Sequence, residues 1–158
     1  MNNFKISFLN DVSFEQFKSF LDSLDEERKS WSLDLQDLKD DKEYYNLMST
    51  YTTGAIVCLC NGNLIALTAT VDFNEFVEIS FVVKKEFQSR GVGTKMLLEM
   101  EKIILDNERR VILAKHFKDN IASHKAFLKA GYKVANIEEP IGHYKNVDKY
   151  EWKIKELQ

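Results

Sequence analysis

The chain has 158 residues and a net charge of −3, and 44% of its residues are hydrophobic and 30% charged. This mixture excludes a disordered chain, and the length predicts a single domain over residues 1–158. The small negative charge argues against a nucleic-acid partner, which needs a positive excess. No apolar run approaches the roughly 18–20 residues that span a bilayer, and no secretory signal is recognisable at the start. We therefore expect a cytoplasmic protein with no membrane partner.

The first third of the chain predicts one strand followed by two helices. Residues 4–9 alternate apolar and polar side chains, as a half-buried strand does. Ser13 can cap a first helix, and a second helix is expected over residues 33–48. The side chains expected on the buried sides of these two helices are Phe14, Phe17, Phe20, Leu21 and Leu24, and then Leu35, Leu38, Tyr45 and Met48.

Strands follow, and their order predicts the middle of an antiparallel sheet. Residues 54–60 and 64–71 flank an Asn-Gly-Asn turn at 61–63, which is typical of a tight hairpin, and residues 76–83 form a third strand. Cys58 and Cys60 lie two residues apart in the first of these strands. They point to one face, and we interpret them as buried reduced thiols.

The second half of the chain alternates helices and strands. Helices are predicted over residues 94–107 and 120–130, the second ended by Gly131. Strands are predicted over residues 111–114, 132–137 and 150–154. The fold class is therefore α+β, with a mixed, mostly antiparallel sheet of about six or seven strands and about four helices.

One segment carries the chemistry, because a polar turn and two glycines lie between a strand and a helix. Glycines let the backbone bring its N–H groups close to a ligand, and the first N–H groups of a helix have no partner within it. Such a turn binds phosphate, and Lys84, Lys85, Arg90 and Lys95 add positive charge. Met96 breaks the dinucleotide fingerprint, and the P-loop spacing is absent. The broken fingerprint and the three antiparallel strands before the glycine turn disfavour a nucleotide-binding oxidoreductase.

The sequence from Gln88 to Gly93, Q-S-R-G-V-G, resembles the Q/R-x-x-G-x-G/A signature of the GNAT superfamily of N-acetyltransferases. Downstream, Asn120 opens a helix that ends eleven residues later in Gly131 and then Tyr132, which resembles that superfamily's second cofactor segment. The order of strands and helices agrees over essentially the whole chain. The resemblance implies a single GNAT-like domain that moves an acetyl group from acetyl-CoA to an amine.

The resemblance also implies which residues bind the cofactor. Backbone N–H groups of the glycine turn would hold the CoA pyrophosphate, from Gln88 through Ser89, Arg90, Gly91, Val92 and Gly93 to Thr94. The pantetheine arm would pair with the strand end formed by Phe81, Val82 and Val83, where that strand splays from its neighbour. Asn120 and Ser123 would contact the same arm from the next helix, although capping of that helix is an alternative role for Asn120.

Acetylation requires a neutral amine, so a general base is expected. Glu78 is the candidate, because it is a carboxylate on a strand otherwise built for burial and the resemblance places a base there. A substrate-binding or structural role for Glu78 stays open, and His116 is the alternative base. A backbone N–H of Val82 or Val83 would polarise the thioester carbonyl.

The proton donor for the leaving thiolate is open. Many family members place a tyrosine seven residues after the helix-opening asparagine, where this chain has Phe127, which we interpret as a core residue. Ser123, His124, Tyr132 or water could substitute, or the thiolate could leave unprotonated. The departure also leaves room for a non-catalytic acyl-CoA sensor or interaction module. His124 and His143 are read as surface or capping residues, and the histidines show no metal-binding spacing.

Charge is distributed unevenly and bears on the acceptor. Residues 10–49 hold 11 acidic and 5 basic side chains, whereas residues 84–133 hold 12 basic and 6 acidic ones. The basic region suits a polyanionic cofactor, and the acidic region suits a small amine or a lysine-bearing peptide, unless its charges are merely solvated. The apolar strand around Trp152 could pair across a homodimer.

Overall fold

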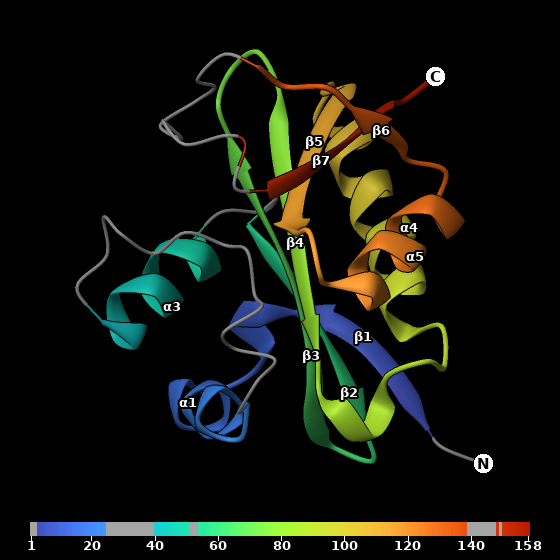
Figure 1. Cartoon of the computed structure of the whole chain (residues 1–158). Helices are drawn as coiled ribbons and strands as arrows, with labels where there is room; N and C mark the ends of the chain where they lie inside the picture. Colours follow the sequence, from blue (N-terminus) through green and yellow to red (C-terminus); the bar gives the residue numbers. More distant parts are fainter. Residues whose placement is uncertain (1–2, 25–39, 51–53, 139–147, 149) are drawn as a thin grey trace.

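The computed structural model describes residues 3–24, 40–50, 54–138, 148 and 150–158, and it is built around one seven-stranded sheet (Figure 1). The sheet order is β1-β2-β3-β4-β5-β7-β6. The strands are β1 (Phe4–Phe8), β2 (Ala55–Cys60), β3 (Asn63–Asp72), β4 (Val77–Val83), β5 (Val111–Phe117), β6 (Lys133–Ala135) and β7 (Tyr150–Glu156). The helices are α1 (Phe14–Asp22), α3 (Asp41–Thr50), α4 (Val92–Asp106) and α5 (Ile121–Lys129), with short 3-10 turns at Leu9–Asp11 and Lys85–Phe87.

Two layers of helices cover the sheet, with α1 and α3 on one face and α4 and α5 on the other (Figure 1). Each layer has its own hydrophobic core. The core under α1 and α3 centres on Phe17, Phe20 and Leu67. The core under α4 and α5 centres on Ile79, Leu97 and Phe127. The central strands are therefore apolar on both faces, which explains their near-continuous hydrophobic sequence.

The hairpin between β2 and β3 forms as its sequence predicts. Asn61 and Gly62 both adopt positive φ, at 52° and 84°, which is the backbone of a tight turn that matches the twist of its strands. Of the six strand pairs in the described sheet, five are antiparallel, and the pair of β4 and β5 is parallel. The predicted α+β class with a mixed, mostly antiparallel sheet is confirmed.

The parallel pair of β4 and β5 is short, and this positions the site. The two strands pair only at Val77–Ile112 and Glu78–Leu113 within the described part of the chain. Beyond Glu78, β4 continues to pair with β3 on its other side as far as Val83. The end of β4 therefore has one open edge inside the sheet.

Some predicted boundaries and buried positions were wrong. The strand expected over residues 111–114 continues to Phe117, because Lys115 and His116 are polar yet buried. On α3 it is Tyr44, rather than Tyr45, that is fully buried, while the start of the helix predicted over residues 33–48, with Leu35 and Leu38, lies largely outside the described residues.

The interpretation of the cysteines is confirmed, since Cys58 and Cys60 are free and buried. Burial raises the pKa of the Cys58 thiol, which keeps it protonated and unreactive. Among the described helices, none combines the length and the apolar character needed to cross a bilayer.

Candidate active site

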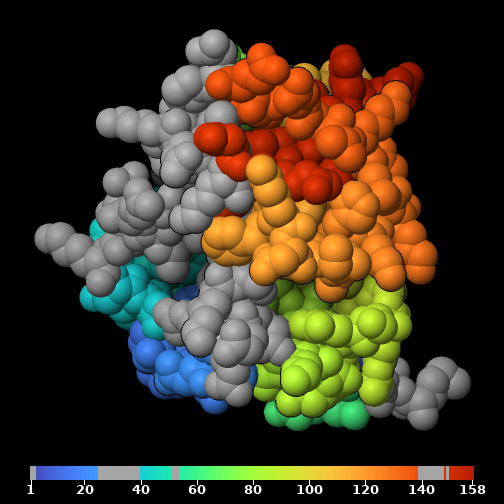
Figure 2. All heavy atoms as spheres, in the orientation of Figure 1, coloured from blue at the N-terminus to red at the C-terminus, as the bar shows by residue number. Residues whose placement is uncertain are grey.

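A cavity of about 1830 Å³ opens between the end of β4, the start of α4 and the side of α5. In Figure 2 the yellow-green surface of the turn and α4 meets the orange surface that includes α5 on one side of the molecule. Every residue predicted to bind the cofactor lines this cavity except Arg90. The guanidinium of Arg90 instead lies 5.4 Å from the centre of the Phe87 ring.

The open edge of β4 presents backbone groups to this cavity. The N–H of Lys84 donates to the carbonyl of Ile65 at 2.9 Å, and the register with β3 is unbroken back to Val77. Since hydrogen bonding alternates along an antiparallel pair, the even-numbered residues of β4 bond to β3 and the odd-numbered ones face the opening. The N–H groups of Phe81 and Val83 therefore face the opening, and that of Val82 does not.

The glycine turn leaves a run of N–H groups available at the start of α4. Gly91 is the N-cap residue, with a φ of 79° in the left-handed region that glycine tolerates, and its carbonyl accepts the first helical bond from Lys95. The N–H groups of the intervening residues have no partner within the helix. Gln88 acts otherwise than predicted, because its N–H bonds to Lys85 and its side-chain amide donates to the carbonyl of Val83 at 3.0 Å.

Gly93 is required by packing rather than by its backbone angles. A Cβ atom at this position would lie 2.8 Å from Cε2 of Phe81, which is too close for two carbon atoms. The helix start therefore sits directly against the end of β4. This contact holds the N–H groups of the turn beside the open strand edge.

The other wall of the cavity is the first turn of α5. The side-chain oxygen of Asn120 caps this helix by accepting from the N–H of Ser123 at 3.1 Å. At the far end, Gly131 has a φ of 92°, and the N–H of Tyr132 donates to the carbonyl of Phe127 at 2.9 Å. The predicted cap and the predicted glycine stop are both confirmed.

Glu78 lies on the opposite face of the sheet from Phe81, on the side of α1 and α3. Its carboxylate is buried, with 1% exposure, and its Oε1 lies 4.0 Å from Nζ of Lys115 on β5, which is equally buried. The Lys115 ammonium also lies 4.4 Å from the centre of the Tyr150 ring. Glu78 does not line the cavity, whereas Val82, on the same face of β4, does.

Comparison with known proteins identifies the family. The family model described as the acetyltransferase (GNAT) family matches residues 17–132. The chain belongs to this family. No significant match was found among curated proteins.

Solved structures with the same fold include several GNAT acetyltransferases, all at identities that show the fold alone. One is yncA of Salmonella typhimurium with its cofactor acetyl-CoA, at 16% identity and a TM-score of 0.73, covering 98% of this chain and 94% of that one. Another is a GNAT-family acetyltransferase of Streptococcus pneumoniae, at 18% identity and a TM-score of 0.72, covering all of both chains. A third is the ribosomal-protein-alanine N-acetyltransferase of Brucella melitensis, at 14% identity and a TM-score of 0.72, covering 97% of this chain and 99% of that one.

Phe127 of this GNAT acetyltransferase is a core residue, as its sequence position suggested. Its ring is buried and packs edge-on against Phe81 and Tyr132, with centroid distances of 5.3 and 5.1 Å. The ring of His116 stacks on it at 6.2 Å with an interplanar angle of 13°. Phe127 therefore joins the cavity wall to a group of polar side chains behind it.

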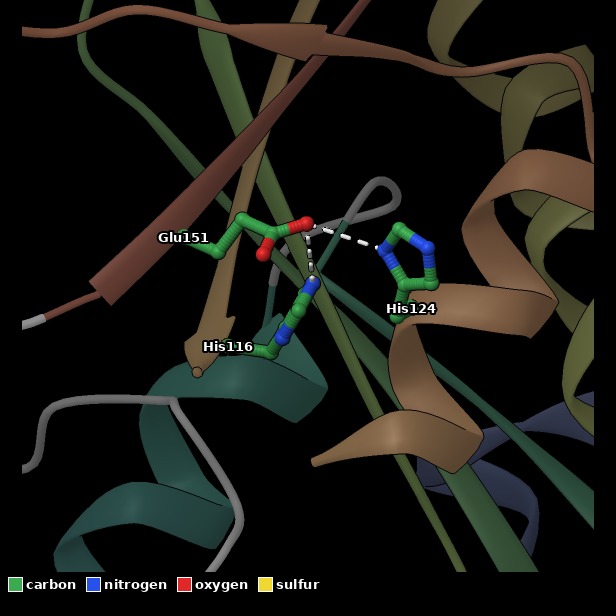
Figure 3. Close-up of side chains that lie close together, drawn as sticks. All are labelled: His116, His124 and Glu151. Carbon is green, nitrogen blue, oxygen red and sulfur yellow. Dashed lines mark hydrogen bonds and ion pairs between the residues drawn. The ribbon is translucent and has the colours of Figure 1, made fainter. Parts of the chain in front are cut away.

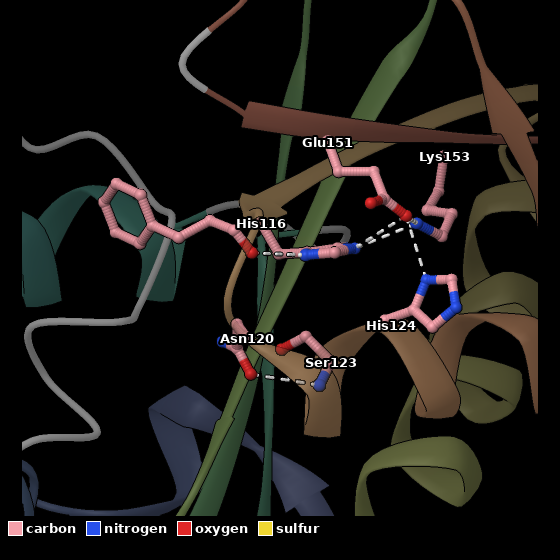
Figure 4. Close-up of polar contacts among 7 residues, drawn as sticks. His116, Asn120, Ser123, His124, Glu151 and Lys153 are labelled. Carbon is pink, nitrogen blue, oxygen red and sulfur yellow. Dashed lines mark hydrogen bonds and ion pairs between the residues drawn. The ribbon is translucent and has the colours of Figure 1, made fainter.

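This polar group was missed from the sequence. His116 of β5, His124 of α5 and Glu151 of β7 converge so that one potential ligand atom from each lies within 4.8 Å of the others (Figure 3). The ammonium of Lys153 lies among them, bonded to Glu151 and 2.9 Å from Nε2 of His116 (Figure 4). A metal ion would therefore have to displace a cation that the fold itself supplies.

The hydrogen bonds fix the charges in this group. Nδ1 of His116 donates to the carbonyl of Phe117 at 2.8 Å, so Nε2 is the acceptor for Lys153 and the ring is neutral. Burial lowers the pKa of His116, which favours the same neutral form. The hydrogen bond from Lys153 lowers the pKa of Glu151, whose carboxylate also accepts from Nδ1 of His124 at 2.9 Å.

Only the strand alternation of β7 could have indicated this group beforehand. Glu151, Lys153 and Lys155 occupy every second position, which places all three on one face. Charged residues at three such positions are typical of a solvated face. The register that turns them toward α5 became visible only in the fold.

Proposed function

We propose that this enzyme transfers an acetyl group from acetyl-CoA to a primary amine, on a small molecule or on a lysine side chain. The observation that carries the proposal is the open edge of β4, which lies between the glycine turn and the first turn of α5 around one cavity. Family membership and the acetyl-CoA in the structure of yncA support the same donor.

The cavity offers donors that match the parts of CoA. The N–H groups between Ser89 and Thr94 form a cradle for the pyrophosphate, with the positive end of the α4 dipole behind them. The backbone of Phe81 offers strand-like pairing to the amide groups of the pantetheine arm, while the carbonyl of Val83 already accepts from the side chain of Gln88. Asn120 uses its side-chain oxygen for the helix cap, which turns its amide N–H donors to other partners.

Acetyl-CoA supplies an activated acyl group in which a thiolate is the leaving group. The N–H of Val83 is the donor on the open edge that would polarise the thioester carbonyl. The amine nitrogen forms the new bond to carbon as the carbon–sulfur bond breaks. The nitrogen of the product amide carries one hydrogen fewer than the nitrogen of the neutral amine. The protons lost by the ammonium therefore have to leave through a base.

We assign the role of that base to Glu78. It would act through a water molecule or along the face of β4 that carries Ser80. Ser80 and Val82 continue the face of Glu78 along β4 to the cavity wall. The ammonium of Lys115 lies 4.0 Å from the Glu78 carboxylate and balances its charge in the buried site. His116 is a poor alternative as the base, because its side chain lies on the opposite face of the sheet from Glu78. Both of its ring nitrogens are also hydrogen-bonded, to the carbonyl of Phe117 and to Lys153.

The leaving thiolate needs little help. A thiol has a pKa of about 8.5, so the thiolate is a stable leaving group near neutral pH. Of the side chains considered as donors, only Ser123 lines the cavity. His124 is bonded to Glu151, and Tyr132 is buried beyond Phe127, so we assign the final proton to water in the cavity or to water relayed by Ser123.

The acceptor would approach from the side of α1, where Ser23 and Leu24 line the cavity. The acidic excess of residues 10–49 would attract an ammonium group to this side, where Asp22 and Asp41 are themselves paired with Lys18 at 2.8 and 3.0 Å. A cytoplasmic location and a homodimer through the strand of Trp152 stay predictions from the sequence.

The test measures thiol release from acetyl-CoA against a panel of small amines and lysine peptides, together with calorimetric binding of CoA. Turnover with any amine supports the proposal. Tight CoA binding without turnover on the whole panel would favour an acyl-CoA sensor. Binding of a nicotinamide dinucleotide in place of CoA would overturn the proposed donor.

A further inference from the structure

The row of charged residues on β7, which we call the β7 charge row (Glu151, Lys153 and Lys155), contacts α5 and the segments that flank it. The three residues pair in register with His116, Ala114 and Ile112 of β5, so they share the face that α5 covers. Lys153 is fully buried. Burying charges in this way costs free energy, and a buried ion pair is weak evidence for stability. A role other than stability is therefore expected for the β7 charge row, and the elements that it contacts indicate which role.

The start of α5 is tied to the row through one carboxylate oxygen. Oε1 of Glu151 accepts from Nδ1 of His124 at 2.9 Å and from the ammonium of Lys153. Lys153 in turn donates to Nε2 of His116 at 2.9 Å, which joins α5, β7 and β5 in one chain of hydrogen bonds. Figure 4 shows these side chains directly beside Asn120 and Ser123.

The end of α5 is tied to the same strand by the third member of the row. Nζ of Lys155 donates to the carbonyl of Ala130 at 2.6 Å and to Oε1 of Glu101 on α4 at 2.6 Å. A cation at this end also matches the negative pole of the helix. The first turn of the nine-residue helix, at His124, and its C-cap residue, Ala130, are thus both fixed to β7, through Glu151 and Lys155.

We infer that the β7 charge row is a positioning device for the cofactor, which sets α5 so that Asn120 and Ser123 meet the pantetheine arm. The inference rests on the proposed function, since it assigns a role to the helix that borders the proposed acetyl-CoA site. His124 is adjacent in sequence to Ser123 and lies one helical turn from Asn120. A small rotation of α5 at His124 therefore moves both cavity-lining residues. The residues of the row act through Asn120 and are positioning residues.

The test uses three variants at His124 and Asn120 in the full chain. His124→Leu removes the donor to Glu151, whereas His124→Asn places an amide nitrogen where Nδ1 lies. We expect His124→Leu to raise the dissociation constant of CoA and the KM for acetyl-CoA about fivefold to tenfold, with kcat within about twofold of wild type. His124→Asn should recover most of the lost affinity.

A double-mutant cycle then separates positioning from a general loss of structure. In the Asn120→Ala background, His124→Leu should weaken CoA binding by less than twofold, because the group that it positions is gone. Asp72→Asn, which removes an exposed partner of Arg109 at 3.0 Å, is the control and should leave CoA affinity unchanged.

Each result bears on a different claim. If the wild-type protein does not bind CoA, the proposed function fails before the variants are compared. If it binds CoA and His124→Leu binds equally well, or if the two substitutions are additive, the positioning inference is overturned. Stoichiometric Zn²⁺ binding by the wild-type protein that is lost in His124→Leu would also overturn it, because the group would then be a metal site.

Discussion

Each face of the sheet buries one lysine, Lys115 of β5 on one face and Lys153 of the neighbouring strand β7 on the other, and the surroundings of the two lysines differ. On the side of α1 and α3, Lys115 lies 4.0 Å from the carboxylate of Glu78 and against the ring of Tyr150. On the side of α4 and α5, Lys153 is hydrogen-bonded to both His116 and Glu151. The first pair lies on the proposed acceptor side and the second group under the proposed cofactor helix.

This difference teaches what each buried charge is suited to do. The carboxylate of Glu78, buried 4.0 Å from the ammonium of Lys115, is the group to which the proposal assigns the proton of the acceptor amine. A lysine locked by two hydrogen bonds is suited to hold elements in place. Changes on the Glu78 face should therefore alter the chemical step, and changes on the Lys153 face should alter cofactor binding.

The largest effect is expected at Glu78. Glu78→Gln preserves the size of the side chain and removes the base, so kcat near pH 7 should fall about 10²–10⁴-fold. The loss should shrink at high pH, where the acceptor amine loses its proton unaided. A pH–rate profile of both proteins checks this, with CoA affinity as the internal control. An equal loss of rate at every pH would contradict the base assignment.

Gly93 tests the packing that joins the cofactor turn to β4. In Gly93→Ala the new methyl group meets Phe81, so we expect a loss of about 1–3 kcal/mol in the free energy of unfolding and weaker CoA binding. Chemical denaturation and calorimetry measure the two effects.

The matched control is Gly62→Ala in the β2–β3 turn. There φ is +84° and no atom lies within 4 Å of the added carbon, so only backbone strain of about 1–2 kcal/mol is expected. CoA affinity should not change. Equal losses of affinity in the two variants would show that stability alone, rather than the contact with Phe81, determines binding.

Asn120 has two roles that substitutions can separate. Asn120→Asp keeps the capping oxygen and removes the amide donors, so stability should stay near that of wild type while the CoA dissociation constant rises roughly 3–10-fold. Asn120→Ala should also lose about 1 kcal/mol of stability with the cap. Thermal unfolding and CoA titration compare them. Undiminished CoA affinity in Asn120→Asp would leave capping as the only role of this residue.

The smallest effect is a pH dependence of stability from the Lys153 face. The folded-state pKa values of His116 and Glu151 are both lowered, by burial and by the hydrogen bond from Lys153 respectively. The unfolded chain therefore binds more protons, so stability falls as pH falls, from below 6.5 for His116 and from below 4.5 for Glu151. Denaturation of wild type and His116→Asn between pH 7 and pH 5 should show a shallower slope in the variant. Parallel slopes would contradict this.

Local patterns were enough to predict much of the fold and the cofactor side of the site. The Asn61–Gly62 turn, the cap at Asn120 and the stop at Gly131 depend on the chemistry of a few neighbouring residues, and all three formed as predicted. The extent of β5 was missed because Lys115 and His116 look like surface residues in sequence. Their burial depends on Glu78, Lys153 and other partners far along the chain, which no local pattern brings together.

The polar group around Lys153 could not be predicted from local sequence patterns either. Its members come from β5, α5 and β7, and sequence separations of 27 and 37 residues divide His124 from Glu151 and His116 from Lys153. The histidine positions gave no metal-like spacing, and the charged residues of β7 resembled a solvated strand. Only the strand order β5-β7-β6 turns them toward the helix.

Product analysis tests the central claim most directly. The protein is incubated with acetyl-CoA and the amine that it uses best, and free thiol and acetylated amine are counted in the same sample. Transfer from acetyl-CoA to the amine predicts one acetylated amine for each thiol released. Thiol release without acetylated amine, or bound CoA with neither product on any amine, would contradict the account.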